Sequence, residues 1–181
     1  KIQSTKQLYE SDINPVFRFL SKHRKDAVAP KLHTLFFDIE VDFCQERGFA
    51  PPFDPFNKIT AISLYMDWAD KLVCLVIPPT SMSKETAEEI VDEFDDTYLF
   101  YNEKEMLLAF LDLIEDADVL SGWNSEGFDI PYIVNRVTKV LSKNDTRRFC
   151  LWDKFPKKRT FERYGAEQQT FDLIGRIHMD Y

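Results

Sequence analysis

Acidic side chains within a hydrophobic stretch are the first residues of this sequence that could carry chemistry. The stretch HTLFFDIEVDF, residues 33–43, has the composition of a β-strand and includes Asp38, Glu40 and Asp42. Since successive strand side chains point to opposite faces, Asp38 and Glu40 share one face, with α-carbons roughly 6.6 Å apart. Buried carboxylates are costly unless they are protonated, paired or bound to a metal. The alternative is an amphipathic edge strand whose acids are solvated.

A second acidic residue lies at the start of a predicted helix. In SGWNSEGFDIPYIVNR, residues 121–136, a strand is expected to end near Trp123, and Asp129 opens a helix after a loop that contains Gly127. An aspartate in this position can accept hydrogen bonds from free backbone N–H groups and suits the helix dipole. Asp129 therefore has a structural explanation as well as a chemical one.

The elements that must position these acids follow from hydrophobic periodicity and turn residues. An antiparallel meander is predicted from three strands, and further strands and helices follow along the chain. Strands are expected over residues 33–43, 58–68, 72–78, 96–101, 118–124 and 169–181, and helices over 16–23, 83–94, 102–114 and 129–141. We expect a short strand before the first helix and an irregular, basic segment over 142–168. Together these elements predict an α/β layer sandwich with the first strand central and helices on the faces.

Bulk properties fit one globular domain. The chain has 181 residues, of which 44% are hydrophobic, and no apolar run approaches the roughly 20 residues of a membrane span. Its three cysteines are widely spaced, which favours a reducing compartment and argues against a structural zinc site. There is no signal-peptide segment, and because the chain starts with Lys1 rather than Met we expect an excised fragment.

Charge is distributed unevenly. The net charge of −8 argues against a protein that coats a DNA duplex, yet residues 143–163 hold eight basic and three acidic side chains. Within this segment Lys157, Lys158 and Arg159 are candidate DNA contacts. Interleaved aromatic side chains could stack on bases, or could instead anchor a solvated loop to the core. These aromatic residues are Phe149, Trp152, Phe155 and Phe161.

The two acidic stretches together resemble a known family. Asp38-Ile39-Glu40 on a strand, followed by Asn124 and then Phe128-Asp129 at a strand-to-helix junction, resemble the first two exonuclease motifs of family B DNA polymerases. The sequence GWNSEGFDIPYIVNRV is similar to the T-even bacteriophage branch of this family. The upstream LYESDINPVFRFL and the final GRIHMDY are also similar to the family, so the resemblance spans nearly the whole chain.

The resemblance implies a ribonuclease-H-like mixed sheet flanked by helices, in a DEDD-type domain for 3′→5′ proofreading. Residues 31–181 would form this exonuclease domain, and residues 1–30 would be a lead-in segment. Asp38, Glu40 and Asp129 would be catalytic ligands of two divalent ions, Mg²⁺ or Mn²⁺, which prefer carboxylate oxygens. Asp38 would bridge both ions, Glu40 would hold the nucleophile-side ion, and Asp129 would hold the second.

Substrate and partners are implied in the same way. Asn124 and Phe128 would position the DNA strand end, although core packing also explains Phe128; Asp42 has no counterpart in the motif. The partners would be the single-stranded 3′ end of a primer, the remainder of the polymerase chain and, through the full-length protein, a sliding clamp, with no membrane. The expected location is the cytoplasm of a bacterial host, for a phage-encoded protein.

One part of the family pattern is missing. The third exonuclease motif, Tyr-x-x-x-Asp, does not occur after Asp129, because Tyr132 is followed by Arg136 and Tyr164 by Gln168 at that spacing. We therefore expect a piece of a replicative polymerase, truncated before the third motif, with weak or no nuclease activity alone. The alternatives are a catalytically inert scaffold or single-strand-binding domain of the same fold, and a stand-alone DEDD exonuclease.

Overall fold

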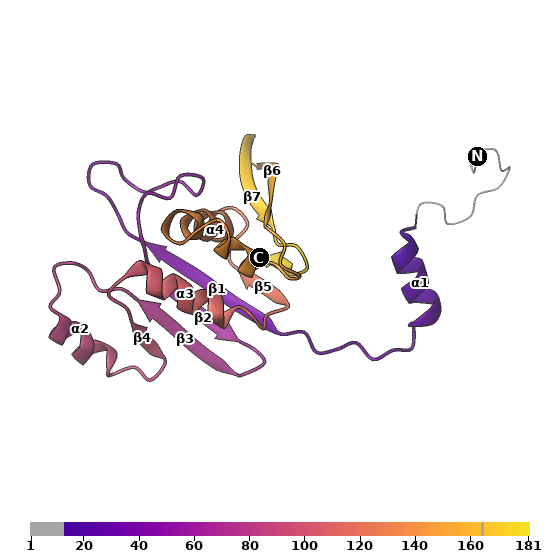
Figure 1. Ribbon diagram of the computed structural model, residues 1–181, viewed down its shortest axis with the longest axis horizontal. Helices are drawn as coiled ribbons and strands as arrows, with labels where there is room; N and C mark the ends of the chain where they lie inside the picture. The colour runs from indigo at the N-terminus through magenta and orange to yellow at the C-terminus, as the bar shows by residue number, and fades with distance from the viewer. Residues whose placement is uncertain (1–12, 164) are drawn as a thin grey trace. The chain divides into compact units, whose positions relative to one another are not determined.

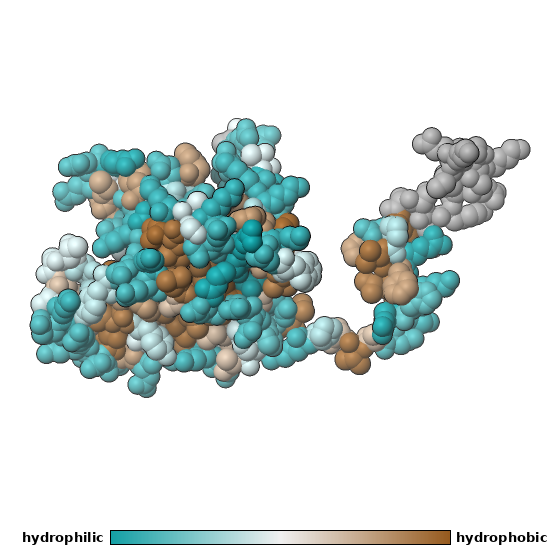
Figure 2. Space-filling model, in the orientation of Figure 1, coloured by the Kyte–Doolittle hydropathy of each residue, from teal (hydrophilic) through white to brown (hydrophobic). Residues whose placement is uncertain are grey.

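The chain divides into two compact units, Lys1–Lys31 and Leu32–Tyr181. The computed structural model describes residues 13–163 and 165–181, so the short strand expected before the first helix lies largely outside the described residues. Helix α1, Pro15–His23, confirms the first predicted helix; Asn14 caps it by accepting the Val16 N–H at 2.9 Å. Figure 2 shows apolar residues gathered on the surface of this helix. Those that are exposed are Val16, Phe17, Phe19 and Leu20.

A six-stranded mixed sheet organises the second unit (Figure 1). Its strand order is β4-β3-β2-β1-β5-β8, so the predicted central position of the first strand is confirmed. Strands β1, β2 and β3 form the predicted antiparallel meander, whereas β5 runs parallel to β1 and β8 runs parallel to β5. The bounds are β1 Thr34–Val41, β2 Ile59–Met66, β3 Lys71–Val76, β4 Thr97–Leu99, β5 Val119–Gly122 and β8 Ile177–Asp180.

Strand β1 has the alternation that its sequence predicts. Leu35, Phe37 and Ile39 are buried, whereas Asp38 and Glu40 are exposed on the opposite face. A register shift in the pairing with β2 occurs after Glu40. Both acids therefore lie on one face near the carboxyl end of β1.

Helices α3, Glu103–Leu113, and α4, Asp129–Val140, cover the buried face of the sheet, while α2, Lys84–Val91, contacts the edge strand β4. Side chains of α3 and α4 join the inward side chains of β1, β2 and β3 in one hydrophobic core. The core confirms a sheet flanked by helices, but within Leu32–Tyr181 the face that carries Asp38 remains open.

Arg136 of α4 holds the loop between β1 and β2 in place. It donates to both carboxylate oxygens of Glu103 at 2.7 and 2.6 Å, and to the Pro55 carbonyl at 2.9 Å. In addition, the Tyr132 hydroxyl donates to the Asn57 carbonyl at 2.8 Å. This loop directly follows the acidic strand, so α4 fixes its path next to the acids.

The prediction of an irregular segment over 142–168 is wrong. A 3₁₀ helix, η2, covers Asp145–Phe149, and strands β6, Lys157–Arg163, and β7, Ala166–Asp172, form an antiparallel hairpin. Most described hairpin side chains are polar, so no buried face produces a hydrophobic alternation. The predicted strand over 169–181 also divides, because the chain turns after β7, with Gly175 at φ +87°, before β8 begins.

Two further sequence expectations concern the whole molecule. Cys44, Cys74 and Cys150 are all free thiols. In the part of the chain that the structure describes, no helix has the length and apolar character needed to cross a membrane.

Candidate active site

The acids are brought together by the parallel pairing of β1 and β5. Because parallel strands end at the same edge of a sheet, the carboxyl end of β1 lies beside the loop that leaves β5. That loop, Trp123–Phe128, leads directly into α4, whose first residue is Asp129. The sheet topology thus joins two sequence motifs that lie about ninety residues apart.

Asp129 contacts the acidic strand directly. Its carboxylate Oδ1 accepts the Ile39 backbone N–H at 3.1 Å, and the residue is only 3% exposed. Ile39 lies between Asp38 and Glu40, whose side chains share the open face. One buried carboxylate is therefore fixed against the strand segment that carries the other two.

In this arrangement, ionisation of the Asp129 carboxyl group is electrostatically unfavourable. The pKa of Asp129 is raised to about 6, mainly by burial and in addition by repulsion from Asp38 and Asp180, while the hydrogen bond from Ile39 acts in the opposite direction. A bound cation would remove this repulsion, because it favours ionised carboxylates around it.

Asn124 and Phe128 lie in the loop next to Asp129, and the backbone explains part of each identity. Asn124 has a φ of +53°, a left-handed conformation that asparagine tolerates well. Its carbonyl accepts the N–H groups of Gly127 and Phe128, at 3.1 and 3.2 Å, and so closes the turn. The Phe128 ring lies 5.3 Å from that of Tyr132, against the core. Their predicted contacts with DNA stay predictions.

Asp180, at the carboxyl end of β8, is a site residue that the sequence did not reveal. Its Oδ1 accepts the Glu126 backbone N–H at 3.3 Å and lies 3.4 Å from the hydroxyl of buried Ser125. It lies in the GRIHMDY stretch that resembles the family, but neither exonuclease motif that the sequence contains includes this aspartate. Only the parallel pairing of β5 with β8 brings its strand end to the same edge of the sheet.

The predicted basic contacts differ in their surroundings. Lys157 and Lys158 are exposed on β6. Arg159 instead donates to Asp172 Oδ1 at 2.8 Å and forms an ion pair with Glu126 of the loop. Two carboxylates thus already contact the guanidinium group that we predicted to bind DNA.

The aromatic residues of the basic segment differ in burial, so neither anchoring to the core nor stacking on bases applies to all of them. Phe149 is fully buried and anchors the segment to the core, whereas Trp152 is 73% exposed. Phe155 is half-buried beneath the Arg147 guanidinium, 4.3 Å from its ring centre. Anchoring therefore explains Phe149 and leaves Trp152 available on the surface.

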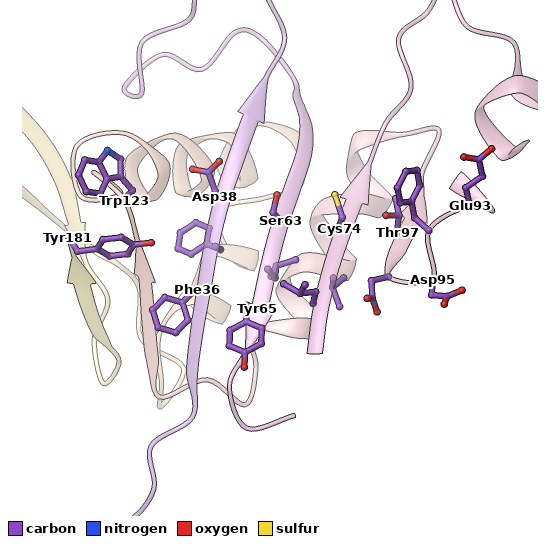
Figure 3. A pocket seen from close by; sticks show the side chains of 16 residues that line it. Phe36, Asp38, Ser63, Tyr65, Cys74, Glu93, Asp95, Thr97, Trp123 and Tyr181 are labelled. Atoms are coloured by element: carbon purple, nitrogen blue, oxygen red, sulfur yellow. The ribbon is translucent and has the colours of Figure 1, made fainter. Parts of the chain in front are cut away.

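A groove of about 690 Å³ follows the open face of the sheet (Figure 3). Asp38, Ser63 and Cys74 form one row across β1, β2 and β3 along its floor. The rings of Trp123 and Tyr181, 5.8 Å apart, line the groove on the same side of the sheet as Asp38. Asp38 therefore lies in a groove with aromatic residues in its wall.

The donor set agrees only in part with a metal site. Carboxylate oxygens are the ligands that Mg²⁺ and Mn²⁺ prefer, and the repulsion around Asp129 favours a cation. Within residues 13–163 and 165–181, however, no three histidine, cysteine or acidic side chains already converge closely enough to hold an ion. The chemistry of the donors fits such an ion, although their present spacing does not close around one.

Comparison with known proteins gives a consistent result. Residues 5–181 match the family described as DNA polymerase family B, exonuclease domain. The chain is 34% identical over 100 residues to the DNA-directed DNA polymerase of Enterobacteria phage T4, covering 54% of this chain and 11% of the relative. It is 28% identical over 170 residues to that of Escherichia phage RB69, covering 83% and 18%.

A further relative comes from another virus. The DNA polymerase catalytic subunit of Epstein-Barr virus, strain B95-8, is 32% identical over 127 residues, covering 69% of this chain and 12% of the relative. The chain therefore spans less than a fifth of the length of each of these three relatives.

Proposed function

Because the chain belongs to the exonuclease-domain family of family B DNA polymerases, we propose that it excises nucleotides from the 3′ end of a primer strand. Residues 31–181 would form the excising domain, and residues 1–30 would lead into it. The observation that carries the proposal is the contact of the Asp129 carboxylate with the Ile39 N–H, between Asp38 and Glu40. It joins the two acidic motifs in one place.

Asp38, Glu40 and Asp129 would hold two Mg²⁺ or Mn²⁺ ions. When bound, the ions would supply a water activated for attack and would neutralise charge on the scissile phosphodiester. Asp38 and Glu40, on the exposed face of β1, can turn toward the groove, whereas Asp129 is held by the backbone of Ile39. The protein thus provides one fixed carboxylate and two that can adjust.

The surrounding residues would bind the strand end. Asn124 and Phe128, next to Asp129, would position the terminal nucleotide, and Lys157 and Lys158 would contact phosphates further along the strand. We propose that Arg159 contributes less to phosphate binding than the two lysines, since Asp172 and Glu126 already pair with it. The remainder of a polymerase chain, and a sliding clamp bound through it, would supply contacts to duplex DNA.

A catalytically inert scaffold is the second candidate. The observation that favours it is the lack of three convergent metal-binding side chains among the described residues. Retention of all three motif acids favours the excising domain, because a scaffold has no need for a buried carboxylate whose pKa is raised.

Digestion of a 5′-labelled single-stranded oligonucleotide with Mn²⁺ tests this function. The full natural chain would be compared with its Asp38→Ala variant and with Asp116→Ala, an exposed control in the turn before β5. We expect stepwise shortening from the 3′ end by the wild type and the control, and none by Asp38→Ala. Absence of shortening by the wild type would support the scaffold.

A further inference from the structure

We propose that Asp180 is a positioning residue for the exonuclease site, an inference that rests on the proposed function. Asp180 would act through hydrogen bonds that fix the Trp123–Phe128 loop, and thereby the start of α4 and Asp129. It would contact neither the DNA nor the metal ions. The evidence lies in the contacts of two consecutive loop residues, Ser125 and Glu126.

One carboxylate oxygen of Asp180 holds both of these residues. Asp180 Oδ1 accepts the Glu126 backbone N–H at 3.3 Å and lies 3.4 Å from the Ser125 hydroxyl. Ser125 is fully buried, so its hydroxyl must find its partners within the protein. The two contacts link the end of β8 to the middle of the loop.

His178 completes this network from the same strand. Its Nε2 lies 2.8 Å from the Ser125 hydroxyl, which also reaches the Gly122 carbonyl at 3.1 Å. The carbonyl of Gly122 and Oδ1 of Asp180 are acceptors here, and serine has one proton to donate. His178 Nε2 can donate to the Ser125 hydroxyl, and Ser125 then shares its single proton between the Gly122 carbonyl at 3.1 Å and Asp180 Oδ1 at 3.4 Å.

Backbone contacts carry this constraint to Asp129. The Ser125 carbonyl accepts the Ile130 N–H at 2.9 Å, which joins the loop to the first turn of α4. On the other side, the Asn124 N–H donates to the Tyr181 carbonyl at 3.2 Å. Asp129 lies between these anchored positions, so its contact with Ile39 depends on where the loop is held.

A second interaction, from the β6–β7 hairpin, also holds the loop. Arg159 of β6 pairs with the Glu126 side chain while Asp180 holds the Glu126 backbone. The Arg159 pair is partly exposed, with 42% and 28% of the two side chains accessible, so it contributes little by itself. Arg159 and Asp180 thus hold Glu126 through different groups, the side chain and the backbone N–H.

Substitutions of Asp180 separate positioning from direct participation. Asp180→Ala removes the acceptor, whereas Asp180→Asn removes the charge and keeps an Oδ1 that can accept the same two bonds. Ser125→Ala removes the hydroxyl from the loop side. Asp116→Ala, an exposed aspartate at the other end of β5, is the matched control.

Two measurements on the full natural chain test the proposal. The first is hydrogen exchange of the Glu126 amide without metal, where we expect protection to fall about tenfold or more in Asp180→Ala and to persist in Asp180→Asn. The second is excision of a 3′ nucleotide with Mn²⁺. Since a 1 Å misplacement can cost about 100-fold, we expect kcat to fall roughly 10- to 100-fold in Asp180→Ala, with KM changed less than about twofold.

Each outcome decides the proposal. Near-normal excision and protection in Asp180→Asn would support positioning, and so would a kcat defect in Ser125→Ala if Asp180→Ala does not fold. Unchanged Glu126 protection in Asp180→Ala, or an Asp180→Asn variant that is inactive with a protected loop, would overturn it. An inactive wild type would remove the proposed function, while the exchange measurement would still decide whether Asp180 holds the loop.

Discussion

Asp129 accepts the backbone N–H of Ile39 over 3.1 Å, although ninety residues separate them in the sequence. The contact places a buried carboxylate against the strand segment between Asp38 and Glu40. It also leaves Asp38 and Asp180 close enough to raise the pKa of Asp129 by repulsion. The same contact therefore organises the site and makes it electrostatically costly without a cation.

Stability without metal should fall as pH rises from about 4 to 7, in part because of Asp129. Its pKa is raised from 3.8 to about 6, so the folded state holds a proton that the unfolded state releases in this range. At about 1.36 kcal/mol per unit, the loss approaches 3 kcal/mol above pH 6. Asp129→Asn should lose this part of the pH dependence in denaturant titrations, and parallel wild-type and variant curves would contradict the prediction. Addition of Mn²⁺ at pH 7 should stabilise the wild type more than Asp129→Asn.

Removal of Arg136 should destabilise the fold strongly. Its side chain and that of Glu103 are each only 11% exposed, so Arg136→Met would leave a buried carboxylate unpaired. We expect the free energy of unfolding to decrease by about 3–5 kcal/mol. Arg148→Met is the control, since its partners Asp112 and Glu115 are mostly exposed and its loss should cost less than about 1 kcal/mol. Equal effects of the two variants in urea titrations would be evidence against this interpretation.

Gly122 should not tolerate a side chain. A Cβ there would lie 2.6 Å from the Phe37 carbonyl oxygen and 3.0 Å from the Ser125 Cβ. The first contact is with backbone, so β1 or the loop must shift, and we expect Gly122→Ala to cost about 1–3 kcal/mol. Because Ser125 must move as well, we expect the excision rate to decrease by more than the loss of folded protein alone would cause. A variant with wild-type thermal midpoint and excision rate would show that the loop absorbs the methyl group.

Lys157 and Lys158 should contribute to binding of single-stranded DNA in the natural chain. Reversing both to Glu removes two exposed positive charges from the hairpin. If each contacts one phosphate, the slope of log affinity against log salt should decrease by roughly 0.7 per contact. Arg159→Gln, a contrasting variant, should change this slope less, because Asp172 and Glu126 already pair with Arg159. Fluorescence anisotropy at several salt concentrations measures both slopes; an unchanged slope in the lysine variant would exclude these contacts.

The sequence by itself determined the local elements and the motif acids. Alternation in residues 33–43 placed Asp38 and Glu40 on one face, and the apolar stripe of residues 102–114 indicated a helix, because burial of one face imposes a period on the chain. It did not predict the hairpin of β6 and β7, since two mostly polar strands carry no such period.

Tertiary structure decided which acids meet. The GRIHMDY stretch resembles the family but does not indicate that Asp180 lies beside Ser125 and Glu126, because that proximity arises from the parallel pairing of β8 with β5. Likewise, burial and neighbouring charge, rather than residue type, raise the pKa of Asp129 to about 6. Contacts between distant strands, and the electrostatics that depend on them, exist only after the sheet has assembled.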